Sequence, residues 1–340
     1  MTEQPPIQPT PVGAFRFNTD SAKLEYFDGN QYVNITTDSP DQHTGGGRGL
    51  LGGGCVAPGG SDDRHVNTID FVTISTTGNA ADFGDLTTRR DFTNSCASRT
   101  RAFFAGGNDP GTEGLNVIDF VTISTTGNAT DFGDMGGAQR ISEGISDQTR
   151  GILPGENAGS NVIKYITMAT SGGVIDFGDL YYGTAAAGSV NSPTRGVIAG
   201  GDNPAYNNII QYLTISTQGN TADFGDISTL RGYVVGASSA TRGLFMSGYN
   251  PSPGTNVNII EFITIATLGD AQDFGDLTTA SRHSGGTSDC IRAILGHGSP
   301  FQGEIDYVQI STLGNAQDFG EMNSDRRGIS GASNAHGGLG

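Results

Sequence analysis

Short runs rich in Val, Ile, Phe, Tyr and Thr recur along the chain and are separated by glycine-rich segments. Such runs are typical of β-strands joined by tight turns. In one of them Ile69 and Phe71 share one face, whereas Val72 and Ile74 share the other, so both faces are apolar. A strand that is apolar on both faces predicts a sheet packed between two other sheets. Equivalent runs start at Phe71, Phe120, Tyr165, Tyr212, Phe262 and Tyr307.

Two further motifs recur with this strand and define a repeat. Asp-Phe-Gly followed by an acidic residue starts at Asp82, Asp131, Asp176, Asp223, Asp273 and Asp318, which gives a period of about 45–50 residues. An arginine opens a short apolar run at Arg48, Arg101, Arg150, Arg195, Arg242 and Arg292. With a small, polar strand before that arginine, each repeat predicts four strands. We therefore expect an all-β protein with a six-bladed β-propeller.

The two ends of the repeat region predict how the propeller closes. The first repeat begins at the Arg48 strand and has no small, polar strand before it, whereas residues 327–340 supply such a strand at the end. We expect this C-terminal strand to complete the first blade and to remove two open sheet edges. The small, polar strands suit the crowded position near the propeller axis.

The Asp-Phe-Gly motif predicts packing between blades. We expect its phenylalanines to fill the space between neighbouring sheets, its glycine to permit a turn, and its acids to lie at strand ends near backbone N–H groups or an arginine. The phenylalanines are Phe83, Phe132, Phe177, Phe224, Phe274 and Phe319. A kinase metal site is excluded, because the motif occurs six times and no kinase catalytic loop accompanies it.

The repeats resemble kelch-type propellers over about residues 44–340. The resemblance is carried by Gly106-Gly107, by Gly200-Gly201 and by the blade-opening arginines Arg90, Arg140, Arg231, Arg282 and Arg327. The chain has no tryptophan, so the phenylalanine of Asp-Phe-Gly stands in the place of the kelch tryptophan, and the third blade shows Ala185 instead of the arginine. The resemblance implies a kelch-like propeller architecture.

The first forty residues have a different pattern. Residues 1–12 are rich in proline and glutamine and predict an extended arm. Alternating runs then flank turn signals at Asn18–Ser21 and at Asp28-Gly29, which predicts a three-stranded β-meander. We expect two domains, residues 1–40 and 41–340. The meander is too small for a core, so we expect it to pair with other chains through Phe15, Phe17, Leu24, Tyr26, Phe27 and Tyr32.

This segment is similar to a short module of virion proteins from tailed bacteriophages, especially phages of marine cyanobacteria. The matching residues are Gly13, Arg16, Phe17, Asn18, Thr19, Lys23, Leu24, Glu25, Tyr26, Asp28, Gly29 and Val33, and Tyr32 replaces a tryptophan. The Asp-Phe-Gly-Asp-Leu repeat also resembles structural proteins of such phages. The resemblance implies a multi-copy fibre, spike or capsid decoration protein that is anchored to other virion proteins. The start of the chain lacks a signal-peptide pattern, so we expect assembly into the virion in the host cytoplasm.

The charge and composition of the chain exclude several classes of binding partner. The chain has 35 acids against 18 bases, a net charge of −17, which disfavours nucleic acid and anionic membrane surfaces as partners. No apolar stretch is long enough for a transmembrane helix. The three cysteines are widely spaced and are predicted to be free thiols, without a zinc site.

The loops between the second and third strands differ most among the repeats and are expected on one face, where recognition usually resides. Their aromatic residues would stack on sugars and their amides would bind hydroxyls, although drift in unconstrained loops is an alternative. These residues are Tyr206, Tyr249, Phe301, Asn203, Asn207 and Asn250. Carboxylates that could bind Ca²⁺ are Asp62, Asp63, Asp109, Glu113 and Asp202. No other cofactor is expected.

We therefore expect a non-enzymatic virion protein that displays a propeller loop face for attachment to a host-surface glycan. A purely structural decoration or joining role is one alternative. A glycan-cleaving, sialidase-like enzyme is another, but it needs paired carboxylates that converge at one end of the axis. In this sequence the acids and arginines repeat with the blades, as scaffold residues do.

Overall fold

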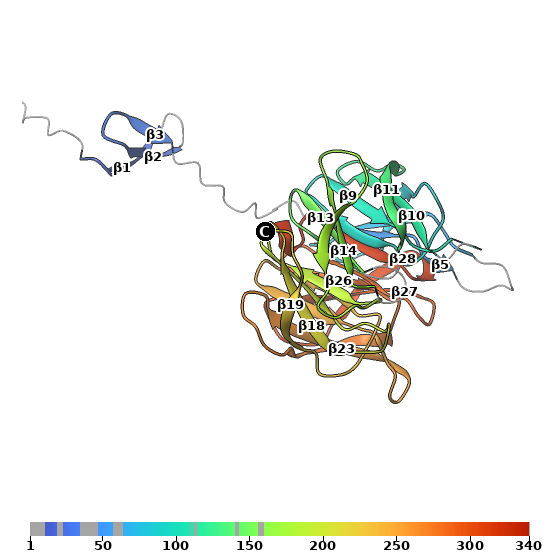
Figure 1. Cartoon of the computed structure of the whole chain (residues 1–340). Helices are drawn as coiled ribbons and strands as arrows, with labels where there is room; N and C mark the ends of the chain where they lie inside the picture. The colour runs from blue at the N-terminus through green and yellow to red at the C-terminus, as the bar shows by residue number, and fades with distance from the viewer. Residues whose placement is uncertain are drawn as a thin grey trace, which may run out of the picture. The chain divides into compact units, whose positions relative to one another are not determined.

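The computed structural model describes residues 11–18, 23–34, 47–56, 64–109, 111, 114–139, 143–155 and 160–339. The chain divides into two compact units, Met1–Thr44 and Gly45–Gly340. Both are built from β-strands, and a short 3-10 helix, Gly337–Leu339, lies near the C-terminus (Figure 1). Within the described part of the chain, no helix has the length and apolar character needed to span a membrane.

The first unit is an antiparallel meander of β1 (Phe15–Asn18), β2 (Lys23–Phe27) and β3 (Tyr32–Asn34), as predicted. On one face, Arg16 Nε lies 2.7 Å from Glu25 Oε2, and its guanidinium stacks on Tyr32 at 3.6 Å. Asp28 holds the second hairpin by accepting the N–H groups of Asn30 and Gln31.

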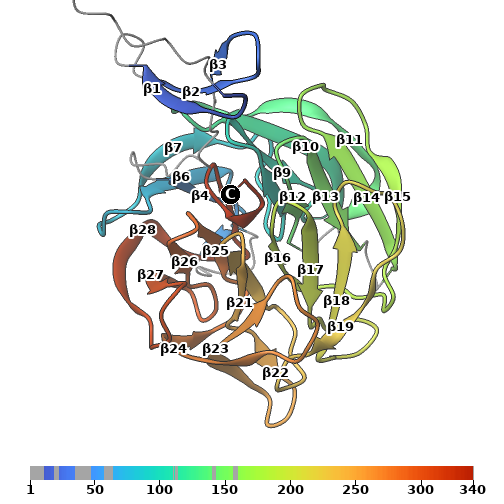
Figure 2. The same ribbon diagram turned by 90° about the vertical axis from the view of Figure 1, so that its left-hand side faces the viewer.

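The second unit consists of six antiparallel sheets of four or five strands, a β-propeller-like arrangement. In Figure 2 the strands β12, β16 and β25 lie toward the middle, and β7, β15, β19 and β28 lie toward the rim. We number the sheets I to VI in chain order.

The strands of each sheet are given in their order across the sheet, starting from the inner edge. Sheet I contains β29 (Ser330–Ser333), β4 (Arg48–Gly52), β6 (Thr68–Thr73) and β7 (Ala81–Asp85). Sheet II contains β8 (Asn94–Ala97), β9 (Arg101–Ala105), β10 (Leu115–Thr122) and β11 (Thr130–Gln139). Sheet III contains β12 (Ile145–Ser146), β13 (Arg150–Pro154), β14 (Val162–Thr167) and β15 (Ile175–Asp179).

The last three sheets follow the same plan. Sheet IV contains β16 (Gly188–Asn191), β17 (Arg195–Ala199), β18 (Ile209–Thr214) and β19 (Ala222–Asp226). Sheet V contains β20 (Val235–Ser238), β21 (Arg242–Met246), β23 (Thr255–Thr264) and β24 (Gln272–Ser281), with the short β22 (Tyr249–Asn250) also on β23. Sheet VI contains β25 (Gly285–Ser288), β26 (Arg292–Gly296), β27 (Gln302–Gln309), β28 (Gln317–Arg327) and β5 (Cys55–Val56).

The last strand of the chain pairs with the first strand of the second unit. β29 runs antiparallel to β4, with Ser330 opposite Gly52 and Ser333 opposite Gly49. The pairing strand begins at Ser330 and not at Arg327, because Arg327 still belongs to β28.

The apolar core lies between neighbouring sheets, as predicted from the strands that are apolar on both faces. Ile69 of β6 is fully buried in a cluster with Phe83 and with Phe104 of sheet II. Val72 and Ile74, next to it in the chain, instead belong to a cluster with sheet VI. All six phenylalanines of the repeated motif are 2–3% exposed, which confirms that they fill the space between sheets.

The glycine of Asp-Phe-Gly does not form a turn, so that prediction is wrong. Gly84 lies inside β7, at a β-bulge where the register with β6 shifts, and has φ +146°. A Cβ atom there would lie less than 3.0 Å from the carbonyl oxygen of Gly127 in the next sheet. The Gly127 N–H donates to the Phe83 carbonyl at 2.8 Å. The motif therefore joins two sheets, and the missing side chain permits their close approach.

Three buried arginines pair with acids of third strands, not with the acids of Asp-Phe-Gly. The pairs are Arg90–Asp119 at 2.9 Å, Arg231–Glu261 at 2.5 Å and Arg326–Asp70 at 2.7 Å. Burial lowers the pKa of each guanidinium, and the adjacent carboxylate opposes that shift. Each pair is almost fully buried, so removal of one partner would leave an uncompensated charge.

The position of the blade-opening arginine also differs from the expectation in several repeats. The residue equivalent to Arg90 and Arg231 is Arg326, one residue before the predicted Arg327. In sheet V the position is Ser281, again one residue before the predicted arginine. There His297 lies between Ser281 Oγ and Asp306 Oδ2, at 2.9 Å from each.

Candidate ligand-binding face

The strand order places two kinds of connection on one side of the second unit. Because neighbouring strands are antiparallel, the loops from second to third strand emerge at the same end as the connections from one sheet to the next. We call this end the loop face.

An axial pocket opens on the loop face. All six connections that lead into the innermost strands line it, so it lies where the six sheets converge. Rings of Phe92, Tyr233 and His283 form its rim, and its volume is about 50 Å³. The side chains of Ala187, Val234 and Ile329, each only 3–5% exposed, form its walls.

A shared backbone conformation places these rings at the rim. Phe92, Tyr233 and His283 have φ of 52°, 59° and 56°, and Ala186 and Gly328 have the same conformation at equivalent positions. The Phe92 N–H donates to the Gly328 carbonyl at 2.8 Å, and the Tyr233 N–H donates to the Ala186 carbonyl at 2.7 Å. Non-glycine residues rarely adopt this conformation, and such strain gathers at functional sites.

The three rim side chains are in contact and the imidazole is neutral. The His283 ring meets Phe92 and Tyr233 edge to face, with centroids 4.9 and 4.3 Å apart. Burial, aided by the positive charges of Arg282 and Arg327, lowers the pKa of His283 to about 3. Burial also raises the pKa of Tyr233, whose hydroxyl is hydrogen-bonded to Asp202.

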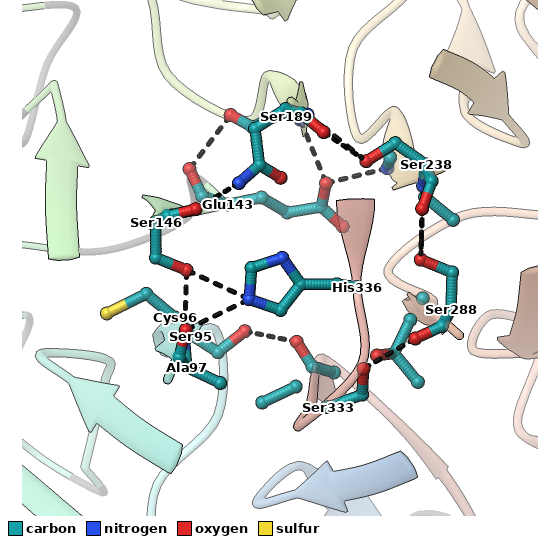
Figure 3. Close-up of a pocket in the computed structure, with 18 residues that line it drawn as sticks. Ser95, Cys96, Ala97, Glu143, Ser146, Ser189, Ser238, Ser288, Ser333 and His336 are labelled. Carbon is teal, nitrogen blue, oxygen red and sulfur yellow. Dashed lines mark hydrogen bonds between the residues drawn. The ribbon is translucent and has the colours of Figure 1, made fainter. Parts of the chain in front are cut away.

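Glu143 separates the axial pocket from an inner cavity and lines both. Its Oε2 accepts the N–H of Ser189 at 2.9 Å and the N–H of Gly236 at 2.6 Å (Figure 3). Burial raises the pKa of Glu143 to about 8, and the two N–H groups oppose the shift. At neutral pH the floor of the axial pocket is therefore mainly an uncharged carboxylic acid.

The inner cavity is surrounded by small and hydroxyl side chains of the innermost strands. His336 lies across it (Figure 3), and its Nε2–H donates to the Ala97 carbonyl at 2.9 Å, while its Nδ1 accepts the Gly338 N–H. Burial lowers the pKa of His336 to about 4, which keeps this ring neutral too. The C-terminal segment thus contributes His336 to the inner cavity that Glu143 also lines.

The structure brings two of the predicted loop residues together beside the axial pocket. The half-buried rings of Tyr206 and Tyr249 lie 5.8 Å apart. The Arg282 guanidinium stacks on Tyr249 at 4.5 Å, and burial, with a smaller contribution from Asp202, raises the pKa of Tyr206. Because Asp202 also bonds Tyr233, this loop cluster adjoins the pocket rim.

Two of the three predicted asparagines have structural hydrogen-bond partners. Asn207 is 6% exposed; its Nδ2 donates to Thr184 Oγ1, and its Oδ1 accepts the Ile209 N–H. Asn250 Oδ1 accepts the Ser252 N–H at 2.9 Å. Asn203 is half-buried and precedes a cis-proline.

The remaining predicted residues lie apart from this cluster. Phe301 is half-buried beneath the guanidinium of Arg327 at 4.9 Å. Asp109 Oδ1 lies 3.8 Å from Arg89 Nε. Asp62, Asp63 and Glu113 lie outside the described residues. Within the described ranges, no three His, Cys, Asp or Glu side chains gather as a metal site would require.

Sequence reasoning missed the rim residues Phe92, Tyr233 and His283 and the floor residue Glu143. A signal was present, because Phe92 and Tyr233 each stand two residues after a buried arginine. In two other repeats the predicted arginines, Arg282 and Arg327, stand one residue after the position equivalent to Arg90. Counting two residues on from them therefore does not lead to the rim position.

The comparisons with known proteins add no relative. No protein family matches the chain, and no curated protein matches it. The class of the protein therefore rests on its structure alone. It is an all-β, β-propeller-like protein with an aromatic pocket where its sheets converge.

Proposed function

We propose that this chain is a non-enzymatic virion protein of a tailed bacteriophage, a fibre, spike or decoration protein that binds a host-surface glycan through its loop face. The observation that carries the binding role is the continuity of the Tyr206–Tyr249 cluster with the aromatic rim of the axial pocket. Aromatic faces stack on the C–H faces of sugars, and a few nearby polar groups then fix orientation. Asp202 and Arg282 are the polar groups of this cluster.

We also propose that the second unit is a closed, six-bladed propeller. Its support is a set of contacts that pass from each sheet to the next and return to the first. The first arginine of each repeat donates to a main-chain carbonyl of the following sheet, from Arg48 to Ile123 and finally from Arg292 to Ile74. The innermost strands also contact one another in the order β29, β8, β12, β16, β20 and β25, and β25 contacts β29.

The first unit is proposed as the virion anchor. The strand register places Phe15 opposite Tyr26 and Tyr26 opposite Val33, on one face of the meander. Phe15 is 65% exposed and Val33 41% exposed, so this face presents apolar surface. Phe17 pairs with Leu24 in the same register, and the side chains of these two lie outside the described part. On the other face Phe27 packs against Tyr32 at 5.2 Å.

A glycan array probed with the full chain tests the binding role. We expect a restricted set of glycans to bind, and we expect Tyr206→Ala or Tyr249→Ala to reduce that binding at least tenfold. Tyr181→Ala is the matched control, because Tyr181 is a tyrosine that is 65% exposed and lies outside the cluster.

The other outcomes identify the alternatives. Presence of the chain in purified particles by mass spectrometry, without binding to any glycan, would indicate a purely structural decoration or joining role. Release of free sugar from a bound glycan would indicate a glycan-cleaving enzyme. Absence of the chain from the particles would contradict the virion assignment.

A further inference from the structure

The axial pocket is small compared with a whole sugar. The space open to the centres of water-sized atoms is about 50 Å³, which suits a group of a few non-hydrogen atoms. An acetamido group has four non-hydrogen atoms, whereas a pyranose ring with its hydroxyls has many more. The pocket therefore has the size of a substituent on a sugar.

The walls and floor of the pocket suit a neutral group with one apolar end. Ala187, Val234 and Ile329 present methyl groups, which favour a methyl group as neighbour. Thr93 and Ser330, whose hydroxyls hydrogen-bond each other, and Ser284 supply polar atoms. Hydroxyl groups can both donate and accept, so they can serve an amide carbonyl or an amide N–H.

The charge state of the pocket disfavours an ionic ligand. Glu143 at the floor is mainly protonated at neutral pH, and His283 at the rim is neutral. The two guanidinium groups that act on His283 stack on rings outside the pocket, Arg282 on Tyr249 and Arg327 on Phe301. A ligand carboxylate would thus lose its hydration in the pocket without a cation to pair with among these residues.

We propose that the axial pocket holds the N-acetyl group of an amino sugar, whose ring stacks on Phe92, Tyr233 and His283 at the rim. The adjoining Tyr206 and Tyr249 then contact the next sugar of the chain. This inference rests on the proposed glycan-binding function and narrows it to glycans that contain N-acetylhexosamine.

Saturation-transfer NMR and calorimetry on the full chain test this inference. The probes are the methyl glycosides of N-acetylglucosamine, N-acetylgalactosamine, glucosamine and glucose. We expect the acetyl methyl protons to show the strongest saturation transfer. We also expect at least one of the two N-acetyl sugars to bind at least ten times more tightly than glucosamine and glucose.

Two variants place the binding in the pocket. Ala187→Leu fills the pocket from the wall, and Phe92→Gly removes one rim ring while retaining a residue that suits φ 52°. We expect each to weaken binding of the N-acetyl sugar at least tenfold, and Tyr181→Ala to leave it unchanged. Circular dichroism and the melting midpoint show which variants are folded, and Phe92→Gly serves as the test if Ala187→Leu does not fold.

The failure of this inference differs from the failure of the proposed function. Equal binding of glucose and the N-acetyl sugars, or undiminished binding by a folded Phe92→Gly variant, would overturn the pocket assignment while leaving a glycan-binding protein. Lack of binding to every glycan on the array would overturn both.

Discussion

Gly84 in the outer strand of sheet I lies directly against Gly127 in the third-to-fourth strand turn of sheet II. The same glycine-on-glycine contact recurs at each step from sheet to sheet, ending with Gly320 of sheet VI against Gly78 of sheet I. In every case the second glycine donates its N–H to the carbonyl of the motif phenylalanine. The contact therefore ties the rims of neighbouring sheets through backbone alone.

Replacement of Gly84 by alanine tests this tie. The new Cβ meets the Gly127 carbonyl, and φ +146° strains an alanine, so we expect a loss of roughly 2–4 kcal/mol in the free energy of unfolding. Gly173→Ala is the control, because a Cβ there meets only Asp134 O, at an ordinary 3.4 Å. Denaturant titration of both variants measures the difference. Equal midpoints would show that the rim contact does not limit stability.

The raised pKa of the half-buried Glu143 predicts that the stability of the protein falls as the pH rises. Its pKa is about 8 in the folded protein against 4.5 for the unfolded chain. Between these values the folded state retains a proton that the unfolded state has lost, so alkali favours unfolding. The loss should reach roughly 5 kcal/mol at most above pH 8.

Glu143→Gln removes this dependence, because the amide cannot ionise. The comparison is best made between pH 6.5 and 8.5, since the lowered pKa values of His283 and His336 contribute below pH 6.5. In that window we expect the melting midpoint of the native protein to fall while that of the variant remains nearly constant. Parallel curves would indicate that Glu143 is ionised in the folded state.

Deletion of residues 328–340 should destabilise the second unit. It removes β29 from β4 together with buried Ile329, Ala332 and Leu339, and it leaves β4 as an open edge. We expect a loss of several kcal/mol, and hence a fall of roughly 10 °C or more in the melting midpoint, or aggregation. Differential scanning calorimetry measures it. A truncated chain that melts like the full chain would contradict a structural role for this strand.

Removal of the first unit should leave the stability of the second unit unchanged but abolish its incorporation into the particle. Residues 45–340 alone should keep the melting midpoint of the second unit, because its core clusters contain no residue before Leu50. They should fail to join the particle, whereas residues 1–44 fused to an unrelated protein should join it. Quantitative mass spectrometry of purified particles reports both. Incorporation of the truncated chain at normal copy number would place the attachment site on the second unit.

The strands and their packing were predictable because a strand's alternation is a local property of the sequence. Ile69 and Val72 reveal two apolar faces without any knowledge of their partners, and both are buried between sheets as predicted. The function of Gly84 was not predictable in this way, because its neighbour Gly127 is 43 residues away in the chain. A glycine motif alone is consistent with a turn and with a close approach between sheets.

The candidate site was less predictable than the fold. Tyr206 and Tyr249 were found because they stand in divergent loops, and the structure places their rings together. Phe92, Tyr233 and His283 were missed because their place at the rim follows from a backbone conformation that residue type does not indicate. Likewise, Asn207 was expected at the surface, and it lies buried, where its amide joins its loop to Thr184 in the connection between β15 and β16.

The position of β4 determines how the second unit responds to mechanical force. The chain enters the described part of this unit at Gly47 and continues into β4, which is hydrogen-bonded to β29 on one side and to β6 on the other. A pull applied through residues 1–44 therefore acts on an interior strand, and β4 cannot be detached without breaking the hydrogen bonds of two ladders, whereas an edge strand is held by only one. Single-molecule force spectroscopy should thus find a higher rupture force when the chain is pulled from its N-terminus than after β29 is deleted.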